Sequence, residues 1–213
     1  MMRSEVEEYF FKDIANHKMT VLLDNGIYRH LRFAKPNERS YWFEIITYPG
    51  ELILTGDMGT YVFRRLEDMF TFFRSENKNA TNLEINPSYW GEKLVATDNN
   101  SLWSSHLEFS GETFRKRVEE NLKDWLADET VSEEEGKQVT EEVAGMLDAI
   151  NNSDDERESI GAARDFSFKV NDHRFEFYDP WEWNCREFRY HYLWCCYAIV
   201  WGIAQYDKQP YVV

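Results

Sequence analysis

The sequence lacks three features that would assign it to a common functional class. Its longest apolar run, Tyr192 to Ala204, has 13 residues, whereas a helix needs about 20 to span a bilayer. The N-terminal residues MMRSEVEEYF have no apolar stretch behind them, so neither a secretory signal nor a transit peptide is expected. Basic residues are not in excess, because 39 acidic against 24 basic side chains give a net charge of −15. Direct binding to nucleic acid or to a membrane is therefore not predicted.

Cysteine and histidine are also scarce. The three cysteines, Cys185, Cys195 and Cys196, are odd in number and lie in one aromatic segment, which favours reduced thiols in the cytoplasm. The five histidines are scattered, with neither an H-E-x-x-H nor a C-x-x-C spacing in the chain. The sequence therefore predicts no metal site and no cofactor.

One pair of residues has the spacing of a nucleophile and its base. His191 precedes Cys195 by four positions, which places both on the same face of a helix. However, Cys195 lies within LWCCYAIVW, and an apolar environment raises the pKa of a thiol and leaves it unreactive. Core packing is the favoured interpretation, and a small enzyme that uses His191 and Cys195 is the less favoured alternative.

Apolar and aromatic residues are abundant, at 43% and 16% of the chain, enough to bury a core. The N-terminal half is predicted to form a helix, an antiparallel meander of four or five strands and a second, short helix. The supporting signals are a capping box at Ser4 and Glu7 for a helix to about Lys18, hairpins around Asp24-Asn25-Gly26 and Tyr48-Pro49-Gly50, and an apolar face on Leu66, Met69, Phe70 and Phe73.

The stretch LTGDMGTYVF, Leu54 to Phe63, places two glycines and an aspartate between apolar runs. A loop that binds phosphate must lead directly into a helix, but the residues that follow, TYVF, favour a strand. We therefore predict that Gly56 to Gly59 form a tight turn that Asp57 closes with its side chain, and an anion site is the alternative. An exposed tip carrying Asp57 and Met58 would also be available to a partner.

The middle of the chain is strongly acidic. Arg117 to Asp165 contains 16 acidic and 5 basic residues, a net charge of −11. Three helices are expected: one capped at Ser110 or Gly111 and ending near Leu126, one capped by Ser132 and Glu135 and ending near Ile150, and one capped by Ser153 and Glu156 and ending near Ala163. In the second, Glu133, Glu134, Glu141, Glu142 and Asp148 are left for the outer faces. These carboxylates are either a binding surface or a solvated face that keeps the protein soluble.

The last region, Phe166 to Val213, begins with FSFKV and RFEFY around Asn171-Asp172, a pattern that predicts another hairpin. An aromatic helix from about Trp183 to Tyr206 should follow Pro180 and pack across the N-terminal sheet. Trp181 and Trp183 stand in the loop-like context DPWEWN, where a tryptophan is either a binding residue or a cover over the core.

Two blocks of the sequence have specific wording. They are Glu7 to Phe73, which contains YFFKDIANHKMTVLLDNGIYRHLRF and ITYPGELILTGDMGTYVFRRLEDMFTFF, and the C-terminal HYLWCCYAIVWGIAQYDK. These blocks resemble a family of small acidic proteins encoded by tailed bacteriophages and prophages. The resemblance covers about half of the chain. It implies a viral protein in the host cytoplasm, and it implies no activity and no catalytic residue.

The sequence therefore predicts a single α+β domain with an antiparallel sheet of about five strands, flanking helices and an acidic helical segment at 111–165. The expected function is that of a phage-encoded inhibitor that binds a basic surface on a host nucleic-acid-handling or defence system, for example in an anti-CRISPR-like role. The alternative is a structural or accessory phage protein. The candidate partner-binding residues are Glu133, Glu134, Glu141, Glu142, Asp148, Asp57, Met58, Trp181 and Trp183.

Overall fold

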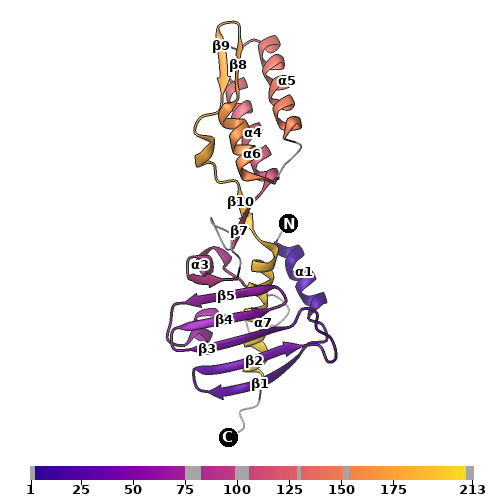
Figure 1. Ribbon diagram of the computed structural model, residues 1–213, viewed down its shortest axis with the longest axis vertical. Helices are drawn as coiled ribbons and strands as arrows, with labels where there is room; N and C mark the ends of the chain where they lie inside the picture. Colours follow the sequence, from indigo (N-terminus) through magenta and orange to yellow (C-terminus); the bar gives the residue numbers. More distant parts are fainter. Residues whose placement is uncertain (1–2, 75–82, 99–105, 129–130, 151–153, 210–213) are drawn as a thin grey trace. The chain divides into compact units, whose positions relative to one another are not determined.

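A computed structural model describes residues 3–74, 83–98, 106–128, 131–150 and 154–209 (Figure 1). The chain divides into two compact units: unit 1 comprises Met1–His106 and Phe188–Val213, and unit 2 comprises Leu107–Glu187. The α+β class is confirmed. The sequence suggested one domain with the acidic segment inside it, whereas the structure gives that segment a core of its own in unit 2.

Unit 1 is built on an antiparallel meander in which every strand pairs with the next one in the sequence. Both predicted hairpins are confirmed, and the positive φ values of Gly26 and Gly50 explain why glycine occupies these turns. The sheet has six strands, one more than the largest number expected from the sequence. The additional strand is the last one, which is short and lacks the alternating pattern that would have indicated it. The strands are β1 (Lys18–Asn25), β2 (Tyr28–Ala34), β3 (Phe43–Tyr48), β4 (Glu51–Gly56), β5 (Gly59–Arg64) and β6 (Leu94–Thr97).

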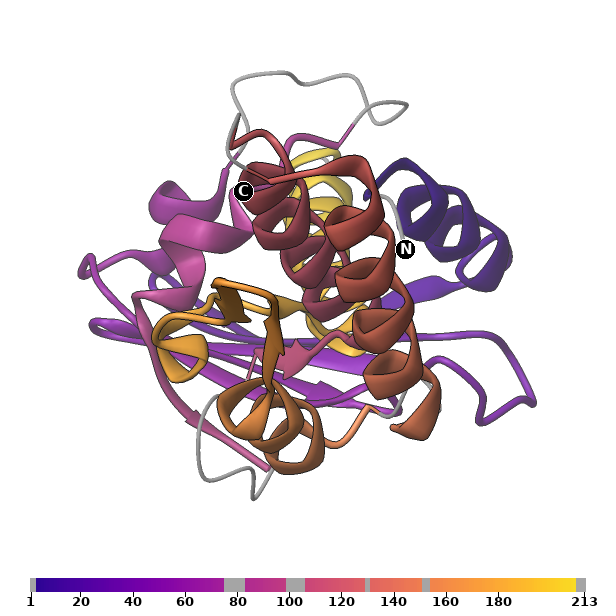
Figure 2. The ribbon, with the colours of Figure 1, turned by 90° about the horizontal axis from the view of Figure 1, so that it is seen from above.

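Four helices of unit 1 contribute to the same core as the inner face of this sheet, and Figure 2 shows α1 in indigo and α7 in yellow on one side of the strands. The helix that covers the sheet is α7, and it approaches so closely at Gly202 that a Cβ atom there would lie 2.6 Å from Ile45. The predicted packing of this helix on the sheet is therefore confirmed. The four helices are α1 (Arg3–Asp13), α2 (Met69–Phe73), α3 (Pro87–Gly91) and α7 (Tyr190–Asp207).

Several predicted helix boundaries in unit 1 are wrong. The first helix already includes Arg3, so Ser4 is not its N-cap, and it ends at Asp13 because β1 begins at Lys18. Leu66 is exposed and lies outside α2, since Asp68 caps that helix by accepting a hydrogen bond from the Phe70 N–H. The aromatic helix α7 begins at Tyr190 rather than near Trp183, because a strand precedes it.

Unit 2 packs three helices with a hairpin. Two short strands, β7 and β10, pair where the chain enters and leaves the unit, and the Ser110 N–H donates to the Cys185 carbonyl. The predicted hairpin around Asn171-Asp172 is confirmed as β8 and β9. The elements are β7 (Leu107–Phe109), α4 (Gly111–Leu126), α5 (Glu133–Ala149), α6 (Glu156–Asp165), β8 (Ser167–Val170), β9 (His173–Glu176), the 3-10 turn η1 (Pro180–Glu182) and β10 (Arg186–Phe188).

The helix caps of unit 2 follow the sequence at two of three positions. Ser110 caps α4, and Ser132 forms the predicted capping box with Glu135 at the start of α5. The third cap is different: Asp155 accepts hydrogen bonds from two backbone N–H groups of α6, and Ser153 lies outside the described residues. None of the helices in the described ranges is both long and apolar enough to cross a bilayer.

Candidate functional site

The negative charge of the chain is concentrated in unit 2. Leu107–Glu187 contains 23 acidic and 10 basic residues, a net charge of −13. The rest of the chain contains 16 acidic and 14 basic residues, a net charge of −2. A partner selected by charge would therefore be attracted to unit 2 and would carry positive charge.

The outer surface of α5 carries the carboxylates that the sequence predicted to be exposed. The inner positions Val139, Val143 and Leu147 are buried, and Ile150, which caps the helix, is buried with them. Lys137 is the single basic residue in the 17 residues of this helix. All five carboxylates expected to face outward are exposed: Glu133, Glu134, Glu141, Glu142 and Asp148.

Three of these side chains form a line along the helix. Glu134, Glu141 and Asp148 are each seven residues apart, so they lie near one face with about 10.5 Å between neighbours. Duplex DNA carries a phosphate charge every 1.7 Å or so along its axis. The line is therefore much sparser than a nucleic-acid backbone, and it can attract cationic side chains without copying the spacing of phosphates.

One acidic residue of α5, Glu135, has an internal role. It is buried, and its carboxylate accepts hydrogen bonds from the Ser132 hydroxyl at 2.6 Å, the Asn171 side-chain amide at 2.8 Å and the Ser132 N–H at 2.9 Å. These hydrogen bonds lower the pKa of Glu135 to about 2. The capping box identified the bonds to Ser132, but no sequence signal indicated that Asn171, in the β8–β9 turn, would meet this helix.

The two candidate tryptophans differ in exposure. Trp181 has an exposed fraction of 61%, whereas Trp183 is half-buried and its ring packs against Phe114 and Phe177. Trp183 is therefore a cover over the core of unit 2, and Trp181 is available at the surface. Tyr178, which the sequence analysis did not select, is 76% exposed. The inward positions of Phe175 and Phe177 in the strand alternation would have predicted that Tyr178 points outward.

The structure does not bring the candidate residues of unit 2 together. The helix α5 packs beside β8 and α4, whereas η1, which contains Trp181, packs beside α6. In Figures 1 and 2 the gold turn at η1 lies on the opposite side of unit 2 from α5. Unit 2 therefore presents two separate candidate surfaces.

The residues at the tip of the β4–β5 hairpin belong to unit 1 and have structural roles. The predicted turn is confirmed, with Asp57 and Met58 between the paired Gly56 and Gly59, and a strand follows it. Asp57 is exposed, but its carboxylate does not close this turn, because it accepts the backbone N–H of Tyr41 at 2.8 Å. Met58 is partly buried against the core. The expectation of a fully exposed tip is therefore wrong for Met58.

The candidate catalytic pair is not formed. Cys195 is completely buried, and burial raises the pKa of its thiol well above the usual range. Its Sγ lies 3.8 Å from the Met58 carbonyl oxygen, and His191 is exposed on the same helix. Because the nucleophile would be protonated and closed off from substrate, this geometry gives no support for cysteine chemistry.

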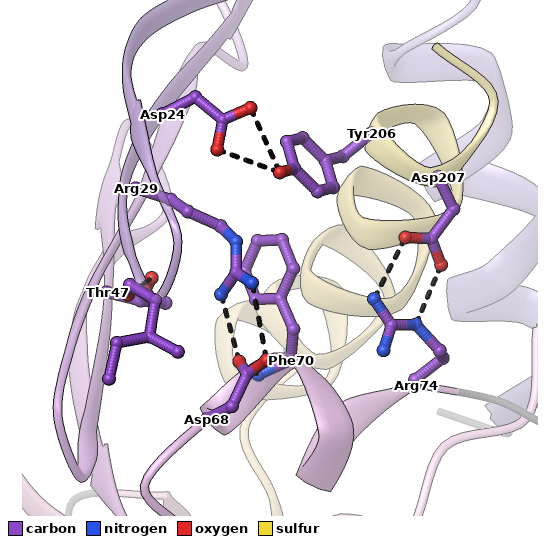
Figure 3. A network of polar contacts seen from close by, with 9 residues as sticks. Asp24, Arg29, Thr47, Asp68, Phe70, Arg74, Tyr206 and Asp207 are labelled. Carbon is purple, nitrogen blue, oxygen red and sulfur yellow. Dashed lines mark hydrogen bonds and ion pairs between the residues drawn. The ribbon is translucent and has the colours of Figure 1, made fainter. Parts of the chain in front are cut away.

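Unit 1 contains a polar network that joins α2 and α7 to the sheet (Figure 3). Arg29 of β2 is buried, and its guanidinium donates to both carboxylate oxygens of Asp68 at 2.9 and 3.2 Å. The Tyr206 hydroxyl donates to Asp24 at 2.9 Å, and Arg74 pairs with Asp207 at 2.8 Å. Each of the three pairs joins two different parts of the fold, so the network fixes the end of α7 against α2 and the sheet rather than forming an open site.

Burial and pairing act in opposite directions on the pKa of Asp68. Burial raises it, but the hydrogen bonds from Arg29 and from the Phe70 N–H, together with the charge of Arg29, outweigh burial and lower the pKa below its ordinary value. Asp68 therefore stays ionised as a partner for Arg29. Over the part of the chain that the structure describes, no group of three or more His, Cys, Asp or Glu side chains is arranged to hold a metal ion.

Comparison with known proteins does not identify the chain. No protein-family model matches it, and neither curated proteins nor solved structures gave a significant match.

Proposed function

We propose that this chain is a phage-encoded inhibitor that binds, through the acidic surface of unit 2, a basic surface on a host protein that handles nucleic acid or serves in defence. An anti-CRISPR-like role in the host cytoplasm is one form of this function. The observation that carries the proposal is the charge difference between the units, −13 against −2, with five of the six α5 carboxylates exposed to solvent. The phage setting rests on the sequence resemblance alone.

The physical mechanism is electrostatic competition. Lysine and arginine clusters that bind phosphates attract other dense anions, and counterion release favours the contact at low salt. The carboxylates of α5 would occupy such a cluster and prevent nucleic acid from reaching it. Because they are more widely spaced than phosphates, affinity would depend on the field of the whole unit rather than on a match of individual positions.

Affinity capture from phage-infected host lysate at low and moderate salt tests this function. The test variant is Glu141→Lys with Glu142→Lys on α5, and the control is Glu67→Lys with Glu84→Lys, which makes the same change in net charge at exposed positions of unit 1. We expect the wild type and the control to retain one dominant basic partner at low salt, and the α5 variant to lose it while remaining folded.

Two results would contradict the proposal. One is a partner that is retained equally by both variants, and the other is a partner whose capture does not weaken as salt rises. Recovery of phage structural proteins instead of a basic host protein would favour the alternative of a structural or accessory role.

A further inference from the structure

The most exposed aromatic side chains of unit 2 lie in one short segment. Tyr178 and Trp181 have the largest exposed fractions among the large apolar side chains of the described residues, and Asp179 and Glu182 are exposed beside them. We call Tyr178–Glu182 the acidic aromatic turn. The exposed fractions are 76% for Tyr178 and 61% for Trp181. Within the described ranges, neither ring stacks on another aromatic ring, so both are open to a partner.

The backbone under these rings is held in place. Pro180 is buried at the start of η1, the Glu182 N–H donates to the Asp179 carbonyl at 2.9 Å, and the Trp183 N–H donates to the Pro180 carbonyl at 3.2 Å. Trp183 is anchored on the core immediately after the turn. Exposed rings on a fixed backbone lose little conformational entropy when they bind, and this is a property of binding hot spots.

Asp179 has an unfavourable backbone conformation in this turn. Its φ of 45° and ψ of 51° lie in the left-handed region, which costs a non-glycine residue free energy. This conformation separates the outward Tyr178 from the η1 turn that carries Trp181. Tyr178 and Trp181 therefore flank Asp179 and the buried Pro180 in the sequence, and both are exposed.

The charge around the rings selects the kind of group that can bind. Glu176, Asp179 and Glu182 are acidic, and no basic residue lies between Glu176 and Trp183. The nearest basic residue on the C-terminal side, Arg186, pairs with Glu156 at 2.7 Å. On the other side, Lys169 and Arg174 face each other across the β8–β9 hairpin and limit the acidic surface there.

An open depression of about 470 Å³ adjoins the anchored Trp183 on the α4 side. Its remaining lining comes from α4: Arg117, Glu120, Asn121, Lys123 and Asp124. Arg117 is paired with Glu120 at 3.0 Å. Because acidic and basic side chains are mixed in this lining, the depression does not select a ligand by charge. The acidic aromatic turn, which has only acidic charges, is the part of this surface that favours a cation.

We propose that the acidic aromatic turn binds an arginine side chain from a basic segment of the partner protein. The guanidinium stacks on the ring of Trp181 or of Tyr178, and the neighbouring carboxylates of Asp179 and Glu182 accept its hydrogen bonds. Arginine is preferred over lysine because its planar group stacks on aromatic rings and pairs with carboxylates at two points. Phosphate-bearing ligands are disfavoured by the same carboxylates. This inference rests on the proposed function of unit 2, but it places the anchor on the opposite side of the unit from α5.

Titration of the full-length protein with short peptides tests the anchor. The probes are a Gly-Arg repeat, a Gly-Lys repeat and a Gly-Gln repeat of equal length. Calorimetric titration measures the affinity of every variant, and the indole N–H signal of Trp181 in an NMR spectrum locates the bound peptide on the wild type. We expect the Gly-Arg peptide to shift this signal and to bind more tightly than the Gly-Lys peptide, with no shift from the Gly-Gln peptide. Trp181→Ala combined with Tyr178→Ala should weaken Gly-Arg binding roughly tenfold, and Trp181→Phe should retain part of the affinity.

The α5 variant Glu141→Lys with Glu142→Lys separates the two proposals. If the anchor is correct, this variant binds the Gly-Arg peptide more tightly than the Trp181→Ala, Tyr178→Ala variant does. If peptide binding is lost in the α5 variant and unchanged in the aromatic variant, the anchor is wrong and the proposed function of α5 stands. Equal binding of the Gly-Gln and Gly-Arg peptides, or no binding of the Gly-Arg peptide, also overturns the anchor. Because both rings are exposed, the aromatic variant should keep the wild-type melting temperature, which serves as the check on folding.

Discussion

Unit 1 and unit 2 use their charged residues in different ways. In unit 1, ion pairs such as Arg29 with Asp68 and Arg74 with Asp207 join elements that are far apart in the sequence. In unit 2, pairs such as Lys116 with Glu112 lie within one helix, and five of the six carboxylates of α5 are exposed to solvent. Unit 2 also has a pair between distant residues, Arg186 with Glu156, but its excess of acidic over basic residues is 13, against 2 in unit 1. The two units therefore differ most in how much of their negative charge has no basic counterpart in the sequence.

The two units also fill their cores differently. Unit 1 buries α7 against α1 and the sheet through aromatic contacts. Trp194 meets Phe10 of α1 and Phe43 of β3 edge to face, with 5.1 and 5.7 Å between ring centroids. Unit 2 has a smaller core in which valines of α4 and α5 meet the phenylalanines of the β8–β9 hairpin and the segment after it. Since the cores are separate sets of residues, a substitution in one unit should leave the other folded.

The largest expected effect is at Gly56. A Cβ atom there would lie 2.2 Å from the Trp42 carbonyl oxygen and 2.7 Å from the Phe43 Cα, and neither backbone atom can move without disrupting the sheet. Gly56→Ala should therefore destabilise unit 1 by about 3 kcal/mol. Denaturant unfolding followed by NMR signals assigned to each unit measures the change.

Gly145 provides the matched control in unit 2. It lies within α5, it is exposed, and no atom is within 4 Å of the position of an added Cβ. Gly145→Ala should stabilise unit 2 by roughly 0.5–1 kcal/mol, because alanine favours a helix. Equal destabilisation of both units by Gly56→Ala would contradict the independence of the two cores.

The second effect tests the role of charge in unit 1. Arg29→Met leaves Asp68 without its partner at a position where the side chain is only 29% exposed, and it should cost about 2 kcal/mol. Lys12→Met is the control, because the side chains of Lys12 and Glu8 are 62% and 68% exposed in their pair, and the loss of such an exposed pair costs much less. A double-mutant cycle with Asp68→Asn isolates the pair, and additive losses would show that Arg29 acts through packing alone.

The pH dependence of this pair has a definite sign. The pKa of Asp68 is lowered in the folded protein, so its contribution is complete above the pKa of the unfolded chain and is lost as pH falls through the folded value. Wild-type unit 1 should therefore lose more stability on acidification than the Asp68→Asn variant.

The third effect concerns Glu135 and is confined to acidic pH. Its pKa is about 2 in the folded protein and about 4.3 in an unfolded chain. Its contribution to unit 2 is therefore complete above about pH 4.3 and disappears toward pH 2. Unfolding measured between these limits should be steeply pH-dependent in the wild type and less so in Glu135→Gln. If the two curves run parallel, hydrogen bonding to Glu135 does not stabilise the ionised form.

The smallest effect tests whether the charge of α5 serves stability. Asp148 lies near the C-terminal end of this helix, where a negative charge opposes the helix dipole. Asp148→Lys should stabilise unit 2 by about 0.5 kcal/mol, whereas Glu134→Lys, in the first turn, should destabilise it by a similar amount. Thermal unfolding of the two variants measures both. A marked loss in Asp148→Lys would mean that this carboxylate has a structural partner.

Most features fixed by local chemistry were predictable from the sequence, although the capping box expected at Ser4 and Glu7 is not formed because the helix already includes Arg3. Features fixed by tertiary contacts were not predictable. The hairpin at Tyr48-Pro49-Gly50 and the capping box at Ser132 and Glu135 depend on neighbouring residues, and both are confirmed. The start of α7 was misplaced because an aromatic run has no helical period of its own, and a pairing between β10 and β7 interrupts it.

The candidate site was predictable to the same extent. The exposure of the α5 carboxylates followed from the helical period, as did the burial of Val139 and Val143. The turn at Gly56 to Gly59 was foreseen, but the use of the Asp57 carboxylate by Tyr41 was not, since these residues are 16 positions apart. The separation of α5 from Trp181 depends on which elements pack beside each other, and one sequence does not contain that information.

The pairing of β7 with β10 has a consequence for biosynthesis. Unit 2 is inserted between β6 and α7, so a ribosome completes all of Leu107–Glu187 before it makes the helix that covers the sheet. Until then the inner side of the meander, including Leu31, Phe33 and Ile45, has no cover from α7. The inserted unit can fold first, and its paired ends then hold the two halves of unit 1 close together when α7 emerges, which shortens the loop that must close. Vectorial synthesis therefore allows the acidic unit to fold before the aromatic helix is made.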